Sequence, residues 1–288
     1  MEAAILTIIT AATPLLLAAL GELVVERSGT LNLGVEGMMV MGAVAGFGAA
    51  HMTGSLMLGI VFAMLAGMAM AGLFGILTLS LRTNQVATGL ALTLLGLGLS
   101  GLIGENFIGM PGARLPKILG LDGLILASFI LVGATHWFLF KTRAGLILRA
   151  VGDNHTSAHA LGYSVIKVRY LAVLFGGAMA GLAGAYLSLA YTPSWVENMT
   201  AGRGWIALAL VVFSSWIPIR LLAGAYLFGA ITILGFVAQG HGLGIPPQLL
   251  ASLPYLVTII ALVVISGNRF IMRANTPAML GQPFVPDR

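Results

Sequence analysis

This sequence has few charged residues and no cysteine. Of its 288 residues, 14 are Lys or Arg, nine are Asp or Glu, and none is cysteine. A soluble globular domain has about 25% charged residues, whereas this chain has 8%, with 59% hydrophobic residues. So little charge excludes a soluble enzyme, a nucleic-acid-binding protein and a disordered chain. Without cysteine, disulfides, thiolate catalysis and cysteine metal sites are excluded as well.

Long uncharged runs mark the expected membrane spans. A helix needs about 20 apolar residues to cross about 30 Å of hydrocarbon. Two runs are long enough for two helices each, with turn-rich breaks at 51–54 and 239–247. The run at 204–219 is shorter, so we expect a short or broken helix there. We predict an all-α integral membrane protein, a polytopic bundle of about nine transmembrane helices, with eight or ten also compatible. The uncharged runs are 3–21, 37–81, 83–104, 123–140, 170–190, 204–219 and 221–268.

Glycine, in contrast, is abundant, with 39 residues. Small residues four positions apart let two membrane helices approach closely. This pattern occurs in each half of the chain, at Gly42 and Gly46 and again at Gly177 and Gly181. We expect glycine-mediated helix packing, and two internal repeats with broken helices are one interpretation of the pattern.

The few basic residues predict the orientation, because Lys and Arg collect on the cytoplasmic side. With nine alternating spans, one side receives eleven of them and the other receives three. The N-terminus is then outside and the C-terminus inside, and the net charge of +5 requires no acidic partner. The eleven are Arg27, Arg82, Lys141, Arg143, Arg149, Lys167, Arg169, Arg220, Arg269, Arg273 and Arg288, and the three are Arg114, Lys117 and Arg203.

One cytoplasmic segment, 141–169, has the look of a surface that meets another molecule in water. It carries six charges in 29 residues. Residues 152–154 offer N-capping side chains and Gly162 a C-cap, which predicts a two-turn helix over 155–161. Its small residues leave a surface on which another protein could pack closely. The alternative is an ordinary loop with a capped turn.

Four motifs resemble one family. Residues 149–154 (Arg-Ala-Val-Gly-Asp-Asn), followed by Ser157-Ala158 and Gly162, resemble the cytoplasmic coupling loop of ABC importer permeases. The resemblance is to the branched-chain amino acid, simple-sugar and nucleoside branch, in which a pair of alanines usually stands where this chain has Ser157-Ala158. The other motifs follow in the family's order at 28–38, 83–92 and 200–207, and the one at 83–92 is similar to the simple-sugar and nucleoside subgroup.

The resemblance implies a permease subunit that forms the translocation pathway for a small polar solute, either a nucleoside or a simple sugar. A branched-chain amino acid is the alternative substrate. Residues 1–288 would form one permease domain in the bacterial cytoplasmic (inner) membrane. The implied partners are a second permease copy or a paralogue, two cytoplasmic ATPase subunits, an external substrate-binding protein and membrane lipid, with no nucleic acid.

ATP and Mg are expected on the ATPase, and we expect no cofactor in this chain. A P-loop needs Gly directly before its Lys, but Lys117, Lys141 and Lys167 follow Pro, Phe and Ile. The resemblance assigns ATPase coupling to Arg149, Asp153, Asn154, Ser157, Ala158 and Gly162.

Polar residues at membrane depth are candidates for the substrate pathway, because they are costly in lipid. Asn32 and Glu36 lie on either side of Gly34 at the start of the second span. They are expected on the pathway or its inner gate, and the alternative is that Glu36 caps a helix start.

A second polar group lies on the first turns of the fourth span. Asn84 and Thr88 share a helical face that suits solute hydroxyls, with Gln85 beside them, and interhelical hydrogen bonding explains them nearly as well. Arg203 is expected to contact the binding protein or to anchor at lipid headgroups.

Enzyme chemistry and ion coupling have little support. The acidic residues read as scattered singly, with no close carboxylate pair and no Ser-His-Asp arrangement. His155 and His159 have a metal-ligand spacing, but no third ligand is nearby. An ion-coupled secondary transporter, the remaining alternative, needs ionisable groups at mid-membrane depth, and the expected span interiors are nearly free of them.

Overall fold

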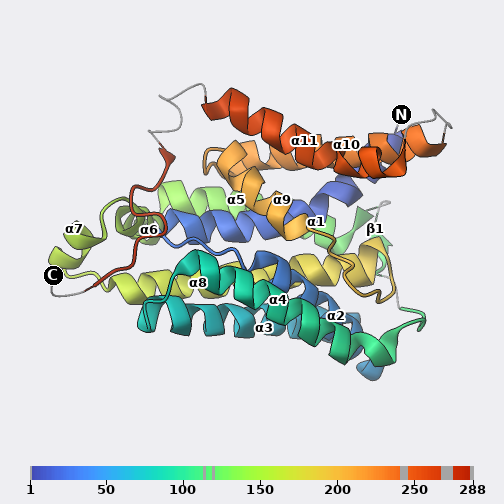
Figure 1. The fold of residues 1–288 in the computed structure, drawn as a ribbon, viewed down its shortest axis with the longest axis horizontal. Helices are drawn as coiled ribbons and strands as arrows, with labels where there is room; N and C mark the ends of the chain where they lie inside the picture. The colour runs from blue at the N-terminus through green and yellow to red at the C-terminus, as the bar shows by residue number, and fades with distance from the viewer. Residues whose placement is uncertain (1, 113–114, 119–120, 241–245, 267–274, 286–288) are drawn as a thin grey trace.

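The computed structural model describes residues 2–112, 115–118, 121–240, 246–266 and 275–285, and these are mostly helical (Figure 1). The helices are α1 (Glu2–Arg27), α2 (Val35–Thr53), α3 (Leu56–Gly75), α4 (Gln85–Gly104), α5 (Gly123–Lys141), α6 (Arg143–Asp153), α7 (His155–Ala160), α8 (Val165–Tyr186), α9 (Arg203–Phe213), α10 (Pro218–Gly240) and α11 (Pro247–Ser266). Two π-helical segments, η1 (Ile76–Ser80) and η3 (Leu187–Tyr191), extend α3 and α8, and η2 (Glu105–Phe107) follows α4. Two short antiparallel strands, β1 (Lys117–Ile118) and β2 (Leu121–Asp122), precede α5.

Seven helices in the described part of the chain are long and apolar enough to cross a membrane: α1, α2, α3, α4, α5, α8 and α10. Shorter apolar helices are α9 and residues 248–260 within α11. A multi-pass helical membrane protein is therefore confirmed, while the count of nine spans and the internal repeats are not.

The predicted break at 51–54 ends α2 in a way that the sequence explains. Gly54 adopts a left-handed conformation (φ 70°), and its N–H donates to the carbonyl of Ala50. The side chain of Ser55 then accepts from the N–H of Leu58 and begins α3. Glycine reaches this conformation without a steric penalty, so the chain reverses at this point.

Helices α2 and α8 form the centre of the bundle. Helix α8 packs against α1, α2 and α3, while α10 and α11 lie on one side and α3 and α4 on the other (Figure 1). The predicted glycine pattern makes these contacts: a Cβ on Gly42 would collide with the backbone of Gly181, and one on Gly177 with the side chain of Ala71. Glycine-mediated packing is therefore confirmed.

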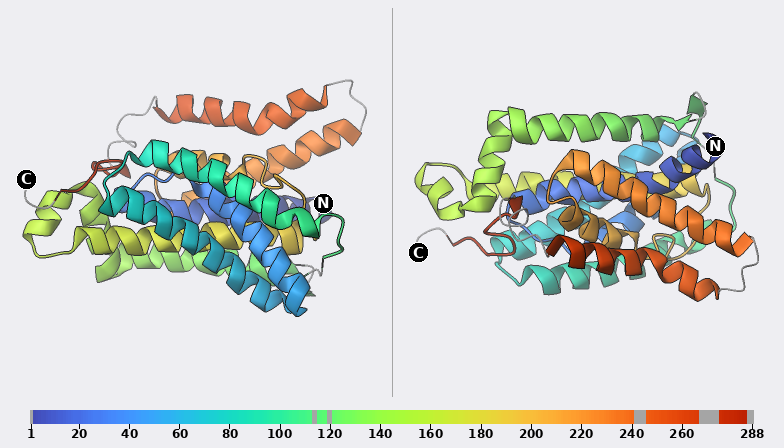
Figure 2. Two further views of the ribbon diagram at one scale, coloured as in Figure 1. Left: turned by 60° about the horizontal axis from the view of Figure 1, so that its bottom comes forward. Right: turned by 90° about the horizontal axis from the view of Figure 1, so that it is seen from above.

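The two ends of the molecule differ in what they carry. Helices α6 and α7 and residues 275–285 gather at the end that we call the α7 end, and the N-terminus and β1 lie at the opposite end (Figures 1 and 2). The first helix runs between the two ends (Figure 1). The basic residues Arg27, Lys141 and Arg149 belong to the α7 end, as the predicted orientation requires.

Two boundaries differ from the prediction because charged residues lie inside helices. Helix α1 continues past Gly21 to Arg27, and Glu22 and Glu26 in its last turns are buried. Helix α8 begins at Val165 rather than at Tyr170. The segment 141–169 therefore contains α6, α7 and the start of α8.

Candidate functional site

Helix α7 is the two-turn helix that the sequence predicts between Asp153 and Gly162. Its N-cap is Asn154, whose Oδ1 accepts from the N–H of Ser157 at 2.9 Å. At the other end Gly162 has φ +87° and its N–H donates to the carbonyl of His159 at 2.8 Å. Both capping predictions are confirmed.

The outward face of α7 is not the one that the sequence analysis expects. Ala158 is only 3% exposed and packs with Val151, Val165 and Phe284. Its small side chain is therefore used inside this chain, and the expectation that it offers a surface to another protein is wrong. Ser157 and Ala160 are exposed, and Leu161, directly after the helix, is 77% exposed.

Charged side chains surround the start of α7. The guanidinium of Arg149 lies over the ring of Phe140 at 5.0 Å, and that of Arg27 lies over the same ring at 5.9 Å. Partial burial raises the pKa of Asp153 above its ordinary value, and the positive charges of Arg27 and Arg149 oppose this rise. Burial and the positive charge of Arg169 lower the pKa of His155, so its ring stays neutral at pH 7.

Glu36 lies where the start of α2 meets the start of α9. Its carboxylate is 2% exposed and accepts from the N–H of Gly202 at 2.8 Å and from that of Gly204 at 2.6 Å. These are N–H groups at a helix N-terminus, which lack partners within the helix. Glu36 therefore caps a helix start, and the helix is α9, contributed from far along the chain.

Replacing Glu36 with alanine is expected to destabilise the protein, because two buried N–H groups lose their acceptor at about 1–3 kcal/mol each. Glu36→Gln should cost less, since its amide oxygen can still accept one bond. The thermal unfolding of the purified protein measures the effect, with Glu105→Ala, an exposed glutamate, as the matched control. An unchanged unfolding temperature for Glu36→Ala would show that α9 does not depend on this cap.

Asn32 and Gln85 hold the buried loop 28–34 between α1 and α2. Asn32 donates its backbone N–H to Oε1 of Glu22 at 3.1 Å, and its Oδ1 accepts from Gly34 at 2.9 Å. The Oε1 of Gln85 accepts from the N–H of Leu31 at 2.8 Å. Among the described residues, Gln85 Nε2 and Glu22 Oε2 are buried without a hydrogen-bond partner.

Asn84 and Thr88 lie near the α7 end. Asn84 caps α4 by accepting from the N–H of Ala87 at 3.0 Å, and Thr88 shares a 2.8 Å hydrogen bond with Thr83. A cavity of about 310 Å³ opens beside them, lined by Arg82, Thr83, Asn84, Gln85, Val86, Gly281 and Pro283. Asn84 and Gln85 therefore line the same cavity as Gly281 and Pro283 near the C-terminus.

Arg203 lines a second cavity, which is partly polar. Its Nη1 donates to the carbonyls of Met199 at 2.9 Å and Thr200 at 3.3 Å, and its guanidinium lies over the ring of Tyr191 at 5.6 Å. The cavity, of about 260 Å³, is formed by α1, α9, α10 and α11 and includes the side chains of Gln239 and Tyr255. Sequence reasoning places Arg203 near the outer surface and does not foresee that Glu36 fixes the backbone on both sides of it.

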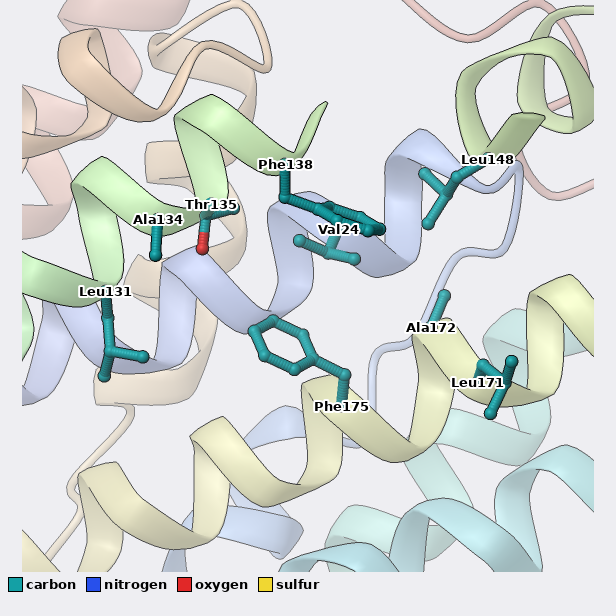
Figure 3. Close-up of a pocket in the computed structure, with 9 residues that line it drawn as sticks. All are labelled: Val24, Leu131, Ala134, Thr135, Phe138, Leu148, Leu171, Ala172 and Phe175. Carbon is teal, nitrogen blue, oxygen red and sulfur yellow. The ribbon is translucent and has the colours of Figure 1, made fainter. Parts of the chain in front are cut away.

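A third cavity, also of about 310 Å³, is almost wholly apolar (Figure 3). Nine residues of α1, α5, α6 and α8 line it, and Thr135 is the one polar side chain among them. Such a lining offers a polar solute almost no hydrogen bonds, so this cavity is not a candidate for the pathway.

A carboxyl pair that sequence reasoning missed lies in α1. Glu22 and Glu26 are one helical turn apart and both buried, so the expectation of no close carboxylate pair is wrong. The Nε1 of Trp216 donates to Oε2 of Glu26 at 2.6 Å, and Arg27 donates to the carbonyl of the same tryptophan. The spacing of four between the glutamates was the available signal. Glu26 and Arg27 together hold Trp216, which lies in the break between α9 and α10.

Known proteins are similar to this chain in sequence and in fold. A protein of Haloferax volcanii, provisionally named a glucose ABC transporter permease, is 41% identical, with 96% of this chain and 95% of that protein covered. A guanosine ABC transporter permease of Bacillus subtilis is 31% identical, with 98% and 97% covered. A solved ABC transporter, provisionally described as of the metal-chelate type and facing inward, has a TM-score of 0.53 at 16% identity, over 91% of this chain and 85% of that chain.

The family comparison covers most of the chain. Residues 4–266, from α1 to the end of α11, match the family described as the permease component of branched-chain amino acid transport systems. The match includes the loop 28–34, α7 and the start of α9, and the structural likeness supports the fold. The chain therefore belongs to the family of branched-chain amino acid transport system permease components.

Proposed function

We propose that this permease component carries a nucleoside or a simple sugar through the bacterial cytoplasmic membrane. Members of its family are transport components, and ATP hydrolysis lies in separate subunits. The substrate class is supported by the names of its relatives, which include glucose, guanosine and nucleoside permeases. The proposed assembly has a second permease copy or a paralogue, two ATPase subunits and an external binding protein, with residues 1–288 acting as one permease domain.

The geometry of α7 is the observation that carries this proposal. An exposed apolar side chain, Leu161, follows a short capped helix whose outer residues Ser157 and Ala160 are small. A face of small residues with one exposed apolar side chain can be covered closely by a partner protein. We assign this face to the ATPase. Asn154 and Gly162 cap its two ends, and Arg149 and Asp153 lie in the helix directly before it.

The pathway candidates take different roles in this proposal. Asn84 lines the cytoplasmic exit, where the cavity beside the α4 cap opens, and Thr88 holds Thr83 of the same lining by a hydrogen bond. Asn32, Glu36 and Gln85 shape the pathway through the backbone that they hold. Arg203 meets the solute or the binding protein from the cavity between α9, α10 and α11.

Uptake into proteoliposomes that contain the permease, its ATPase and its binding protein tests the proposal. We expect uptake of labelled guanosine, ribose or glucose that requires ATP inside the vesicle. A clear preference for leucine would establish the branched-chain amino acid alternative. Uptake driven by a proton or sodium gradient in the absence of ATP would overturn the assignment to an ATP-driven importer.

A further inference from the structure

Residues 275–285, which we call the C-terminal strap, cross the α7 end as a turn followed by an irregular segment (Figure 1). We propose that the strap positions α7, with Phe284 as its wedge and Arg169 as its anchor, so that movement of α7 reaches the loop 28–34. The coupling part of this inference rests on the proposed function, whereas the positioning of α7 does not.

Hydrogen bonds to the backbone of the strap hold it to segments that are far apart in the sequence. Its partners lie at the end of α1, in the loop after α1, at the end of α6 and in α8. The bonds are Arg27 Nη1 to the carbonyl of Asn275 (3.0 Å), Met279 N–H to the carbonyl of Gly152 (2.9 Å), Gly281 N–H to the carbonyl of Gly29 (3.1 Å) and Arg169 Nη1 to the carbonyl of Gln282 (2.8 Å). A segment held at four points is a fixed part of this end.

The two glycines that receive the strap have no room for a side chain. A Cβ on Gly152 would collide with the carbonyl oxygen of Arg27, and one on Gly29 would lie 2.8 Å from Nη2 of Arg169. Gly29 also has φ +86°, a conformation that favours glycine. The end of α6 and the loop after α1 are thus in direct backbone contact beneath the strap.

Phe284 contacts both turns of α7. Its ring meets the rings of His155 and His159 edge to face, with centroids 5.2 and 5.3 Å apart. Phe284 is 8% exposed, and it packs in one cluster with Val151 of α6, Ala158 of α7 and Val165 of α8. The burial of Ala158, which sequence reasoning did not foresee, is a consequence of this wedge.

Helix α7 needs such support because it has six residues. An isolated helix shorter than about 12 residues is marginal in water, since its few hydrogen bonds do not offset the cost of nucleation. Its direction relative to the membrane helices is therefore set by tertiary contacts. Phe284 supplies aromatic contacts on the same side as α6 and α8.

Arg169 connects the strap and α7 to the membrane part of the chain. Its guanidinium is 1% exposed and bonds three segments: Nε to the carbonyl of Ser28 (3.2 Å), Nη1 to that of Gln282 (2.8 Å) and Nη2 to Nδ1 of His155 (3.3 Å). A planar guanidinium holds such partners in fixed directions. The loop after Ser28 in turn bonds Gln85 at the start of α4. A displacement of α7 is thereby transmitted to the helix that lines the proposed exit.

The absence of cysteine allows a direct test of the positioning. Spin labels at Leu161→Cys and Val86→Cys report the distance between the end of α7 and α4 in the purified permease. We expect Phe284→Ala to broaden this distance distribution and Phe284→Tyr, which keeps the ring, to restore it. Phe284→Leu keeps apolar volume without the ring and should give a distance distribution of intermediate width. This variant keeps the proposal testable if Phe284→Ala fails to fold.

The consequence for coupling is measured in the complex with the ATPase. Phe284→Ala should reduce the stimulation of ATP hydrolysis by loaded binding protein about fivefold or more, while basal hydrolysis stays the same. A merely structural contact would lower the unfolding temperature without changing this ratio. An unchanged distance distribution together with normal stimulation would overturn the role of the strap. Failure of the wild-type ATPase to bind at all would reject the proposed function and leave the positioning result intact.

Discussion

Leu161→Glu is expected to abolish binding of the ATPase while leaving the permease folded. The side chain is 77% exposed, so the substitution costs the isolated permease little. In the docked complex the new carboxylate would be removed from water without a partner, which costs several kcal/mol. We therefore expect loss of co-purification with the ATPase and loss of ATP-dependent uptake.

The matched control is Met52→Glu. Met52 is 79% exposed, and it lies in the last turn of α2, away from α7. This variant should bind the ATPase as the wild type does. Ala158→Glu is unsuitable as a docking test, because that position is buried beside Phe284 and a charge there would disturb the permease itself. Normal co-purification of Leu161→Glu would exclude this face of α7 from the contact.

Gly181→Val is expected to prevent folding. Gly181 in α8 lies between α2 and α3, and a Cβ there would collide with the backbone carbonyl of Ala63. Neither backbone can move away, since α8 is packed on several sides by other helices. Overpacking a core commonly costs about 1–3 kcal/mol when side chains give way, and a clash with backbone atoms costs more.

Size-exclusion chromatography of the detergent-solubilised protein measures the folded fraction. The control is Gly133→Val in α5, where a Cβ meets no atom within 4 Å among the described residues. We expect a monodisperse peak for Gly133→Val and aggregate for Gly181→Val. A folded Gly181→Val protein would mean that α2, α3 and α8 can separate without loss of the fold.

The features that follow from local chemistry could be predicted from the sequence. The break at Gly54 depends on one residue that tolerates a left-handed conformation, and α7 depends on Asn154 and Gly162 at its two ends. The uncharged runs predicted most spans because a charge usually marks the point where a helix meets water.

That same rule failed where charges have partners inside the protein. Glu26 stays within α1 because Trp216, 190 residues later, donates to it, and Arg169 stays within α8 because its bonds reach Ser28 and Gln282. Glu36 caps a helix that begins more than 160 residues further along the chain. No pattern of neighbouring residues predicts hydrogen-bond partners that lie so far away in the sequence. The amphipathic helix α6 was missed for a related reason, since its charges made the segment read as a loop.

The strap also has a consequence for biogenesis. Arg169 leaves the ribosome 113 residues before Gln282, and Arg27 leaves 248 residues before Asn275. During synthesis α7 therefore exists without its wedge until the chain that follows α11 has been released. If the ATPase docks on α7 as proposed, a nascent permease presents no finished docking surface, and we expect recruitment of the ATPase to follow insertion of the last span. Under this proposal, the transporter assembles only after the strap has been synthesised and has bound at the α7 end.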